Sequence, residues 1–265
     1  MTASVSPIKP VRKTPPLAPR IFDTAAATIL DEPLEHRLSE LRARYADVSG
    51  RPLLEAVISR EFPESLAIVS SFGAESVVIL HMVAEIDPTV PVLFLNTGKL
   101  FGETLRYRDR LQDTLKLTDI RSIGPHPRDE AQFDPDGTLW SRNPDQCCFF
   151  RKVLPIRRAL KGFDAQVTGR KRFQTQARLS MPTIEVSEGK FKINPLADYT
   201  LDDLNAYIEE HRLPRHPLFE DGYLSIGCMP CTQRVKDGEG YRSGRWAGTD
   251  KDECGLHTNL AGDGI

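Results

Sequence analysis

The chain has 265 residues, of which 40% are hydrophobic and 27% are charged, and its formal net charge is −2. This is the composition of an ordinary globular protein, and the length fits one large domain with appendages. A near-neutral chain offers no global basic field for nucleic acid, and its longest apolar runs are too short to cross a bilayer.

The N-terminal segment differs in composition from the rest. Its first 22 residues hold no acid, four Lys or Arg residues and five prolines. Such a proline density opposes the amphipathic helix of an organellar transit peptide, and no apolar stretch marks a secretory signal. We therefore expect a disordered tail over 1–25 in a cytoplasmic protein.

Strand and helix patterns alternate along the remaining chain. Helical spacing over 30–62 predicts two helices separated at Gly50 and Pro52. Further helices are predicted at 75–86, 102–117, 146–160 and 201–211, and short strands at 66–71, 90–95, 119–123, 165–168 and 191–196. This alternation predicts an α/β fold with a doubly wound, mostly parallel sheet, which we place in a nucleotide-binding domain at 26–240.

The turn between the first predicted strand and its helix, Val69–Ser76, is rich in small and hydroxyl residues. Backbone N–H groups there can approach an anion at the helix N-terminus, although a plain strand–helix turn has the same pattern. No Gly-Lys-Ser/Thr follows, so it is not a Walker loop. It resembles the Ser-Gly-Gly-x-Asp-Ser pyrophosphate loop of the adenine-nucleotide alpha-hydrolase-like superfamily. Phe72 replaces the first glycine and Glu75 the aspartate, which favours a smaller adenylate over ATP.

Five cysteines divide into the pairs Cys147-Cys148 and Cys228–Cys231 and the single Cys254. Two pairs favour a metal site over a redox dithiol or a vicinal disulfide. Neighbouring residues of a helix point about 100° apart. Adjacent cysteines therefore fit the separated corners of an iron–sulfur cubane better than tetrahedral zinc, which stays the alternative. Cys254 lies on a Gly-rich tail. Its thiol is therefore not expected to be part of a buried core.

Basic residues cluster locally. Arg157-Arg158 is interpreted as a solvated face. The segment 169–178 follows the carboxyl end of a predicted strand, where α/β sheets bind ligands, so its cations are expected to hold phosphate or sulfate oxygens. RNA is the competing polyanion, but only 8% of residues are aromatic.

Three motifs together resemble the assimilatory adenylyl-sulfate (APS) reductases of the phosphoadenylyl-sulfate (PAPS) reductase family, over about 66–260. They are Cys-Cys-x-x-Arg-Lys at 147–152, Cys-x-x-Cys at 228–231 and Glu-Cys-Gly-Leu-His at 253–257. The family's Leu-Asp-Thr-Gly reads Leu95-Asn96-Thr97-Gly98 here. Its tryptophan run is reduced to Trp246-Ala247-Gly248, which puts the fine tuning of substrate binding in question more than the chemistry.

The resemblance implies a [4Fe–4S] cluster on Cys147, Cys148, Cys228 and Cys231. It also implies that Cys254 is the catalytic nucleophile, on a flexible, mobile C-terminal tail at 241–265. His257 either assists there or only holds the tail. The implied substrate-binding residues are Ser70, Ser71, Gly73, Glu75, Leu95, Gly98, Lys152, Gly169, Arg172, Gln174, Arg178, Arg242, Arg245 and His257.

The function implied is the reduction of APS to sulfite and AMP through a cysteine S-sulfonate, in sulfate assimilation and cysteine biosynthesis. External thioredoxin, or glutaredoxin, is expected as the reductant, and the enzyme is expected to be a homo-oligomer that binds neither nucleic acid nor membrane. The cluster is expected to be electrostatic or structural, because thiol exchange already supplies both electrons. The alternatives are PAPS or dual APS/PAPS reduction, an ATP-dependent tRNA thiolation enzyme, and a nonenzymatic zinc- and nucleotide-binding module.

Overall fold

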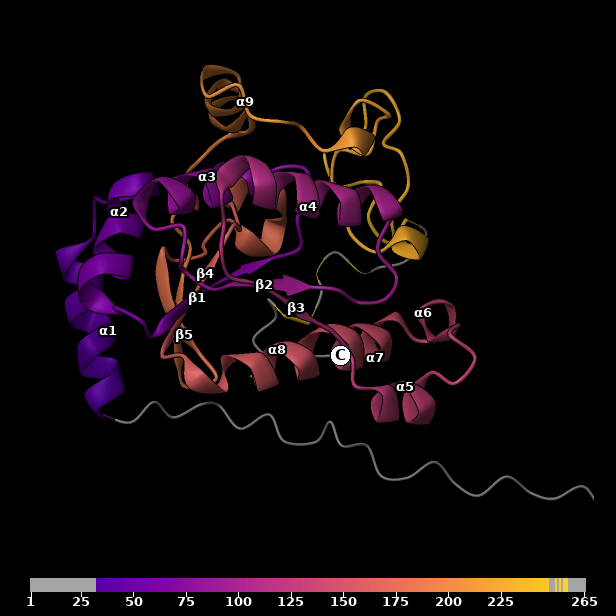
Figure 1. Ribbon diagram of the computed structural model, residues 1–265, viewed down its shortest axis with the longest axis horizontal. Coiled ribbons are helices and arrows are strands. Elements are labelled where there is room, and N and C mark those ends of the chain that lie inside the picture. The colour runs from indigo at the N-terminus through magenta and orange to yellow at the C-terminus, as the bar shows by residue number, and fades with distance from the viewer. Residues whose placement is uncertain (1–31, 248–250, 252, 254, 257–265) are drawn as a thin grey trace, which may run out of the picture.

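A mixed sheet lies at the centre of the molecule (Figure 1). The computed structural model describes residues 32–247, 251, 253, 255 and 256. Within them the strands are β1 (Leu66–Ser70), β2 (Val92–Leu95), β3 (Ile120–Ile123), β4 (Ala165–Thr168), β5 (Ile184–Ser187) and β6 (Lys190–Ile193). Their order in the sheet is β3-β2-β1-β4-β6-β5. Neighbouring strands are parallel except for β5, which runs antiparallel to β6.

Helices cover both faces of this sheet, which confirms the predicted doubly wound α/β fold. In Figure 1, α3 and α4 lie over one face and α8 under the other, while α1 packs beside β5. No helix in the described part of the chain is long and apolar enough to cross a membrane. The helices are α1 (Glu32–Arg44), α2 (Gly50–Ala56), α3 (Ser76–Ile86), α4 (Gly102–Leu115), α5 (Pro127–Phe133), α6 (Leu139–Arg142), α7 (Pro144–Cys148), α8 (Leu154–Ala159) and α9 (Leu201–Glu210).

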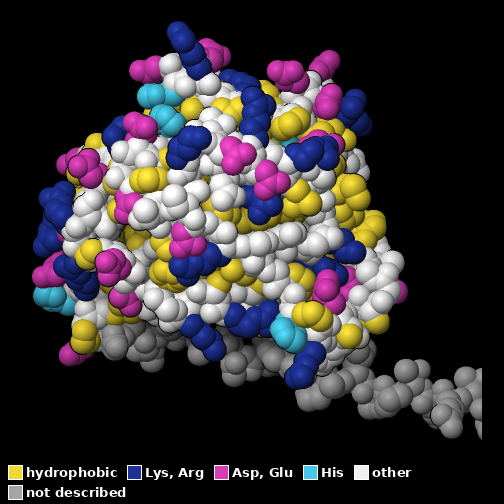
Figure 2. Space-filling view, in the orientation of Figure 1, with side chains coloured by type: hydrophobic (Ala, Val, Ile, Leu, Met, Phe, Trp, Pro, Cys, Tyr) yellow, Lys and Arg dark blue, Asp and Glu magenta, His cyan; other side chains and the backbone are white. Residues whose placement is uncertain are grey.

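The central strands are buried on both faces. All four residues of β2 are buried, and so are four of the five in β1. Their continuous apolar sequences fit this position, because a parallel strand between two helical layers has no solvent face. Each buried Leu, Ile or Phe contributes about 1.5–3 kcal/mol to folding. The outer surface is different, since basic and acidic side chains are interspersed over the face seen in Figure 2.

Strand β5 was not predicted, and a two-residue turn explains its place in the sheet. Glu188 and Gly189 connect β5 to β6, with φ values of 53° and 72°. Two successive positive φ angles are those of a type I′ turn, which joins antiparallel strands tightly. The Ile-Glu-Val-Ser sequence before it alternates apolar and polar residues, as expected of an edge strand.

The helix predicted over 146–160 is interrupted. It consists of α7, a π-helical turn at Phe149–Val153, and α8, followed by a 3₁₀ turn at Leu160–Gly162. Pro155, in the first turn of α8, has no N–H to donate to the preceding turn, and a wider turn before it accommodates this loss. Single π turns occur frequently at functional sites. This one directly follows Cys147 and Cys148.

A buried histidine makes the stability of the fold sensitive to pH. His216 is 0% exposed, its Nδ1 accepts a hydrogen bond from Leu218 N at 3.2 Å, and its Nε2 lies 3.0 Å from Thr104 Oγ1. Burial lowers the pKa of His216 to about 4 from a reference of 6.5. The neutral form is therefore the folded form, and its stabilising contribution is complete above pH 6.5 and is lost as the pH falls towards 4.

We expect this histidine to remove about 3 kcal/mol from the free energy of unfolding between pH 7 and pH 4. Urea unfolding of the wild type and of His216→Asn, which keeps an acceptor but does not titrate there, measures the difference. The wild-type curve should fall more steeply over this range. Parallel curves for the two proteins would show that His216 does not titrate as stated.

Candidate active site

A cavity of about 190 Å³ opens where the strand order reverses, at the carboxyl ends of β1 and β4. This is the position at which open α/β sheets bind ligands, because the connections leave β1 and β4 in opposite directions. Several segments that are far apart in the sequence converge on it. Its lining includes Ser70, Ser71, Gly73, Glu75, Leu95, Lys152, Gly169, Gln174, Arg178, Arg242 and Arg245 from the predicted binding set.

The loop after β1 contains a phenylalanine, Phe72, whose side chain does not enter the cavity. Phe72 has a left-handed backbone with φ of 52°, and its N–H donates to Ser70 Oγ at 3.1 Å. Its ring is 0% exposed and packs edge-on against Phe94, with ring centroids 5.1 Å apart. A non-glycine residue in this conformation costs about 1–2 kcal/mol. Because the ring points into the core, the part of the loop before Glu75 offers only backbone and small side chains to the cavity.

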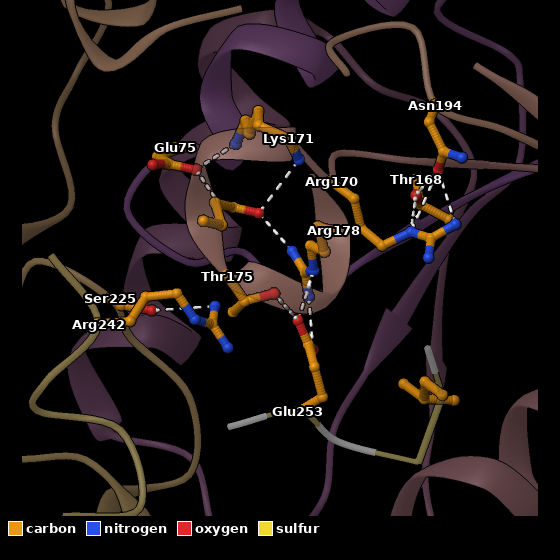
Figure 3. A network of polar contacts seen from close by, with 12 residues as sticks. Glu75, Thr168, Arg170, Lys171, Thr175, Arg178, Asn194, Ser225, Arg242 and Glu253 are labelled. Atoms are coloured by element: carbon orange, nitrogen blue, oxygen red, sulfur yellow. Dashed lines mark hydrogen bonds and ion pairs between the residues drawn. The ribbon is translucent and has the colours of Figure 1, made fainter. Parts of the chain in front are cut away.

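Glu75, at the N-terminus of α3, is neutralised from the loop after β4. Its carboxylate forms an ion pair with Lys171 (Figure 3). It also accepts a hydrogen bond from Gln174 Nε2 at 2.7 Å. Burial lowers the pKa of Lys171, and the Glu75 charge partly opposes that shift. Burial also raises the pKa of Tyr241, with the Glu75 charge as the next cause. The carboxylate therefore does not present an unbalanced negative charge to the cavity.

A second carboxylate comes from the C-terminal segment. Glu253 accepts hydrogen bonds from Arg178 Nη2 at 2.7 Å and from Thr175 Oγ1 at 3.0 Å (Figure 3). Arg170 is held separately by Asn194 and Glu185 at the base of the same loop. Arg178 and Arg170 are thus paired with acids in the fold.

Three further cations of the cavity lie close to the indole ring of Trp246. Trp246 is 4% exposed, and the cationic groups of Arg245, Arg242 and Lys152 lie 4.5, 5.9 and 5.9 Å from its ring centroid. Lys251, which is outside the cavity lining and forms an ion pair with Asp145, lies 5.7 Å from the same centroid. Cations close to an aromatic ring are held there by electrostatic attraction to the face of the ring. This wall of the cavity is strongly positive.

The segment that carries these arginines is fixed to the Cys-x-x-Cys loop. Trp246 N donates to Cys231 O at 3.0 Å, and Gln233 N donates to Gly244 O at 2.7 Å. Residues 241–246, which the sequence assigned to a flexible tail, therefore form part of the cavity wall. The described residues 253 and 256 also contact the domain.

The four paired cysteines line a second, smaller cavity beside the first. All four are free thiols, and Thr97 Oγ1 lies 3.2 Å from Cys228 Sγ. Burial, and then the neighbouring Cys148, raises the pKa of Cys147 to about 12. Burial followed by Cys228 raises the pKa of Cys231 as well.

These thiols share an environment in which an unaccompanied thiolate is disfavoured, so a cationic group between them would fit the donor chemistry. In the part of the chain that the structure describes, no three His, Cys, Asp or Glu side chains form a group that could hold a single metal ion. Lys152 and Cys228 line both cavities. The two sites are therefore in direct contact.

Two predicted binding residues lie elsewhere. Arg172 pairs with Asp198 and donates to Met181 O at 2.8 Å. Gly98 is not in the cavity lining, and a Cβ placed on it would meet Arg151 Nη1 at 3.4 Å. Lys171 takes the place expected for Arg172. The reason is that Lys171 has an extended backbone, and neighbouring side chains of an extended segment point in opposite directions.

Cys254 and His257 lie outside the described residues. Sequence reasoning did not single out Lys171, Tyr241 or Glu253. Lys171 belongs to the basic cluster that was recognised, whereas Tyr241 adjoins the arginine pair in sequence. Glu253 belongs to the terminal motif, and its partner Arg178 lies 75 residues away in sequence, so no local pattern connects them.

The phosphoadenosine phosphosulfate reductase domain model matches residues 65–234. The adenosine 5′-phosphosulfate reductase of Mesorhizobium japonicum is 47% identical over 86% of this chain and 89% of its own length. That of Chelativorans sp. strain BNC1 is 47% identical over 82% of this chain and 89% of its own length.

Among solved structures, the phosphoadenylyl-sulfate reductase of Candida auris, in a phosphate complex, superposes with a TM-score of 0.62 at 31% identity. The alignment covers 76% of this chain and 97% of that one. The fold is that of the adenine-nucleotide alpha-hydrolase-like proteins. The chain belongs to the phosphoadenosine phosphosulfate reductase family.

Proposed function

We propose that this protein reduces adenylyl sulfate to sulfite and AMP, with thioredoxin as the electron donor. The observation that carries the proposal is the cavity at the β1/β4 reversal, whose cationic wall of Lys152, Arg242 and Arg245 adjoins the four-cysteine cavity. The names of the relatives from Mesorhizobium and Chelativorans support APS as the substrate. The neutralised Glu75 and the small loop after β1 favour an adenylate with few phosphates.

In the proposed first step, the Cys254 thiolate attacks the sulfur of APS. A sulfur–sulfur bond forms, the bond from sulfur to the phosphate oxygen breaks, and AMP leaves with the electron pair. Lys152, Arg242 and Arg245 bind the sulfate and phosphate oxygens, and they stabilise the charge that develops on the departing phosphate. The same cations favour the thiolate form of a nearby cysteine.

In the second step, a thiolate of reduced thioredoxin, or of glutaredoxin, attacks the sulfur of Cys254. Sulfite leaves, and a mixed disulfide forms. The second thiol of the reductant resolves this disulfide and restores the Cys254 thiol. The dithiol supplies two electrons, and the sulfur of the sulfonyl group passes from oxidation state +6 to +4.

We further propose that Cys147, Cys148, Cys228 and Cys231 hold a [4Fe–4S] cluster. Their shared cavity and the outward splay of adjacent helical cysteines support this donor set. When bound, the cluster would supply a structural link between α7 and the Cys-x-x-Cys loop, and with its four thiolates it would place a net negative charge beside Lys152. Lys152, which lines both cavities, transmits no electron in this scheme and acts as an anion-binding group.

The cellular setting follows from the same proposal. A reductase of this kind serves sulfate assimilation and cysteine biosynthesis, and we place it in the cytoplasm as a homo-oligomer that binds neither nucleic acid nor membrane. A tRNA thiolation enzyme would instead consume ATP, and a nonenzymatic zinc module would turn over nothing.

Purified protein with APS and reduced thioredoxin should release AMP and sulfite in equal amounts. PAPS in a parallel reaction measures the preference between the two nucleotides, and ATP in a third tests the thiolation alternative. Turnover of ATP with none of APS would contradict the proposal.

Gly244, in the segment that carries Arg242 and Arg245, provides a specific test of the cavity wall. A Cβ on Gly244 would lie 2.2 Å from Gln233 O, so the backbone that carries Arg242 and Arg245 must shift. We expect Gly244→Ala to raise the KM for APS by about tenfold or more. Gly240→Ala is the matched control, because a Cβ there meets nothing within 4 Å. Equal KM values for the two variants would show that the loop does not position the substrate.

A further inference from the structure

A cluster of three aromatic side chains lies between α3 and α9. It consists of His81 on α3, Tyr207 on α9, and His211, the residue at the C-terminal end of α9. The helix α9 packs against α3 (Figure 1). None of the three side chains lines the substrate cavity or the four-cysteine cavity. The proposed reductase reaction therefore makes no use of them.

The two histidine rings of this cluster lie close enough to bind one metal ion between them. The ring centroids of His81 and His211 are 4.7 Å apart, and the ring planes meet at 48°. With metal–nitrogen bonds of about 2.0–2.1 Å, two imidazoles on one ion have centroids about 4.5 Å apart at a right angle and about 5.2 Å apart at the tetrahedral angle. The observed separation is nearer to the right-angle value. It therefore favours nickel(II) or copper(II) over tetrahedral zinc.

Tyr207 contacts both rings and restricts their orientation. Its hydroxyl lies 2.9 Å from His81 Nδ1, and its ring lies against that of His211 with centroids 4.2 Å apart. Burial raises the pKa of Tyr207 to about 12, so the phenol stays neutral near pH 7 and is a hydrogen-bond partner rather than a ligand. A metal-binding histidine commonly donates its second ring N–H to a nearby oxygen, which leaves its other nitrogen for the metal. In His81 that other nitrogen is Nε2.

The surroundings of His81 favour the neutral imidazole, which is the form that binds a metal ion. Burial, and next a charge on His211, lowers the pKa of His81. Glu85, one helical turn farther along α3, opposes this shift, whereas Arg51 on α2 adds to it. The charged groups of Glu85 and Arg51 lie 3.9 Å apart and offset one another. Because His81 is half-buried and His211 is exposed, an ion can reach the pair from solvent.

We propose that His81 and His211 bind one divalent transition-metal ion of the nickel(II) or copper(II) class, which joins α3 to α9. Their ring nitrogens supply two adjacent coordination positions, and water fills the others. No group of three His, Cys, Asp or Glu ligands occurs among the described residues, so this is an open, exchangeable site rather than a closed structural one. Helix α3 follows the loop after β1, and α9 precedes the Cys-x-x-Cys loop, so the ion connects two parts of the chain that both contribute to the substrate cavity.

Calorimetric titration of nickel(II) into the holoprotein tests the site, in a Cys254→Ser parent whose nucleophilic thiol does not compete for the ion. We expect one ion per chain, with His81→Gln and His211→Gln each weakening binding by about 100-fold or more. Tyr207→Phe keeps the ring but loses the hydroxyl, and it should weaken binding by about tenfold. His36→Gln is the matched control, because the His36 side chain on α1 is 76% exposed. Absence of nickel binding by the parent, or unchanged binding in His81→Gln or His211→Gln, would overturn the proposal.

Thermal unfolding gives a second readout that does not depend on catalysis. An ion that binds only the folded protein stabilises it by mass action, so nickel(II) at about 100 times its Kd should raise the Tm of the parent by about 5 °C. The Tm of His81→Gln should not change on adding nickel(II), and its Tm without metal shows whether the variant is folded. An equal rise in the parent and in folded His81→Gln would contradict the proposal. The site does not rest on the reductase activity, so the nickel result decides it even if the wild type fails to turn over APS.

Discussion

Replacing Cys254 by serine is expected to lower kcat for APS reduction by at least about 1,000-fold. Serine has nearly the same size, so the segment between Glu253 and Leu256 keeps its contacts with Arg178 and Lys192. The hydroxyl, however, is a far weaker nucleophile than a thiolate at neutral pH. The segment that carries Arg242 and Arg245 and the loop after β1 are unchanged in this variant. The Kd for AMP should therefore equal that of the wild type.

Steady-state release of AMP measures the first of these quantities, and equilibrium binding of AMP measures the second. A variant that loses both turnover and AMP affinity would indicate a disrupted cavity. A variant that retains turnover would remove Cys254 from the chemistry. The iron content of Cys254→Ser should equal that of the wild type, since the four cluster cysteines remain in place. This comparison shows that the substitution leaves the cluster site intact.

Replacing Cys228 by alanine is expected to abolish binding of the iron–sulfur cluster and to lower kcat by about 100-fold or more. Cys228 lines both cavities, and Leu100 and Cys228 form an antiparallel bridge that joins the Cys-x-x-Cys loop to the segment after β2. Loss of the cluster would remove the negative charge of the cluster and its thiolates from beside Lys152. It would also release the loop to which Trp246 and the arginines are attached.

Iron and acid-labile sulfide content, visible absorbance and APS turnover measure this outcome. Met229→Ala is the matched control, because Met229 lies between the same two cysteines and its side chain is 58% exposed. The control should retain iron and activity. Full iron content in Cys228→Ala would contradict the assignment of Cys228 as a ligand.

Much of the fold follows from local patterns. The apolar runs at β1 and β2 and the helical spacing of α3 and α4 each predict the secondary structure of their own segment. The alternation of strands and helices along the chain then predicts a parallel sheet. Strand β5 escaped prediction because it is four residues long and lies at an edge, where burial leaves a weak pattern. Its only strong signal was the Glu188-Gly189 turn.

The candidate site was predictable only in part. Ser70 and Gly169 could be placed, because the carboxyl ends of adjacent parallel strands must meet. Lys171 lines the cavity and the predicted Arg172 does not, since the direction of a side chain depends on the backbone angles of its residue. The pairing of Arg178 with Glu253 also lay beyond the sequence, because it depends on tertiary contact across 75 positions.

The central claim is that Cys254 accepts the sulfonyl group of APS, and one labelling measurement tests it most directly. The holoprotein is incubated with APS labelled at sulfur, without thioredoxin, and the label on each peptide is then counted. We predict one label per chain on the peptide that contains Cys254, its release as sulfite by reduced thioredoxin, and no label in Cys254→Ser. Equal labelling of the wild type and Cys254→Ser would contradict the account.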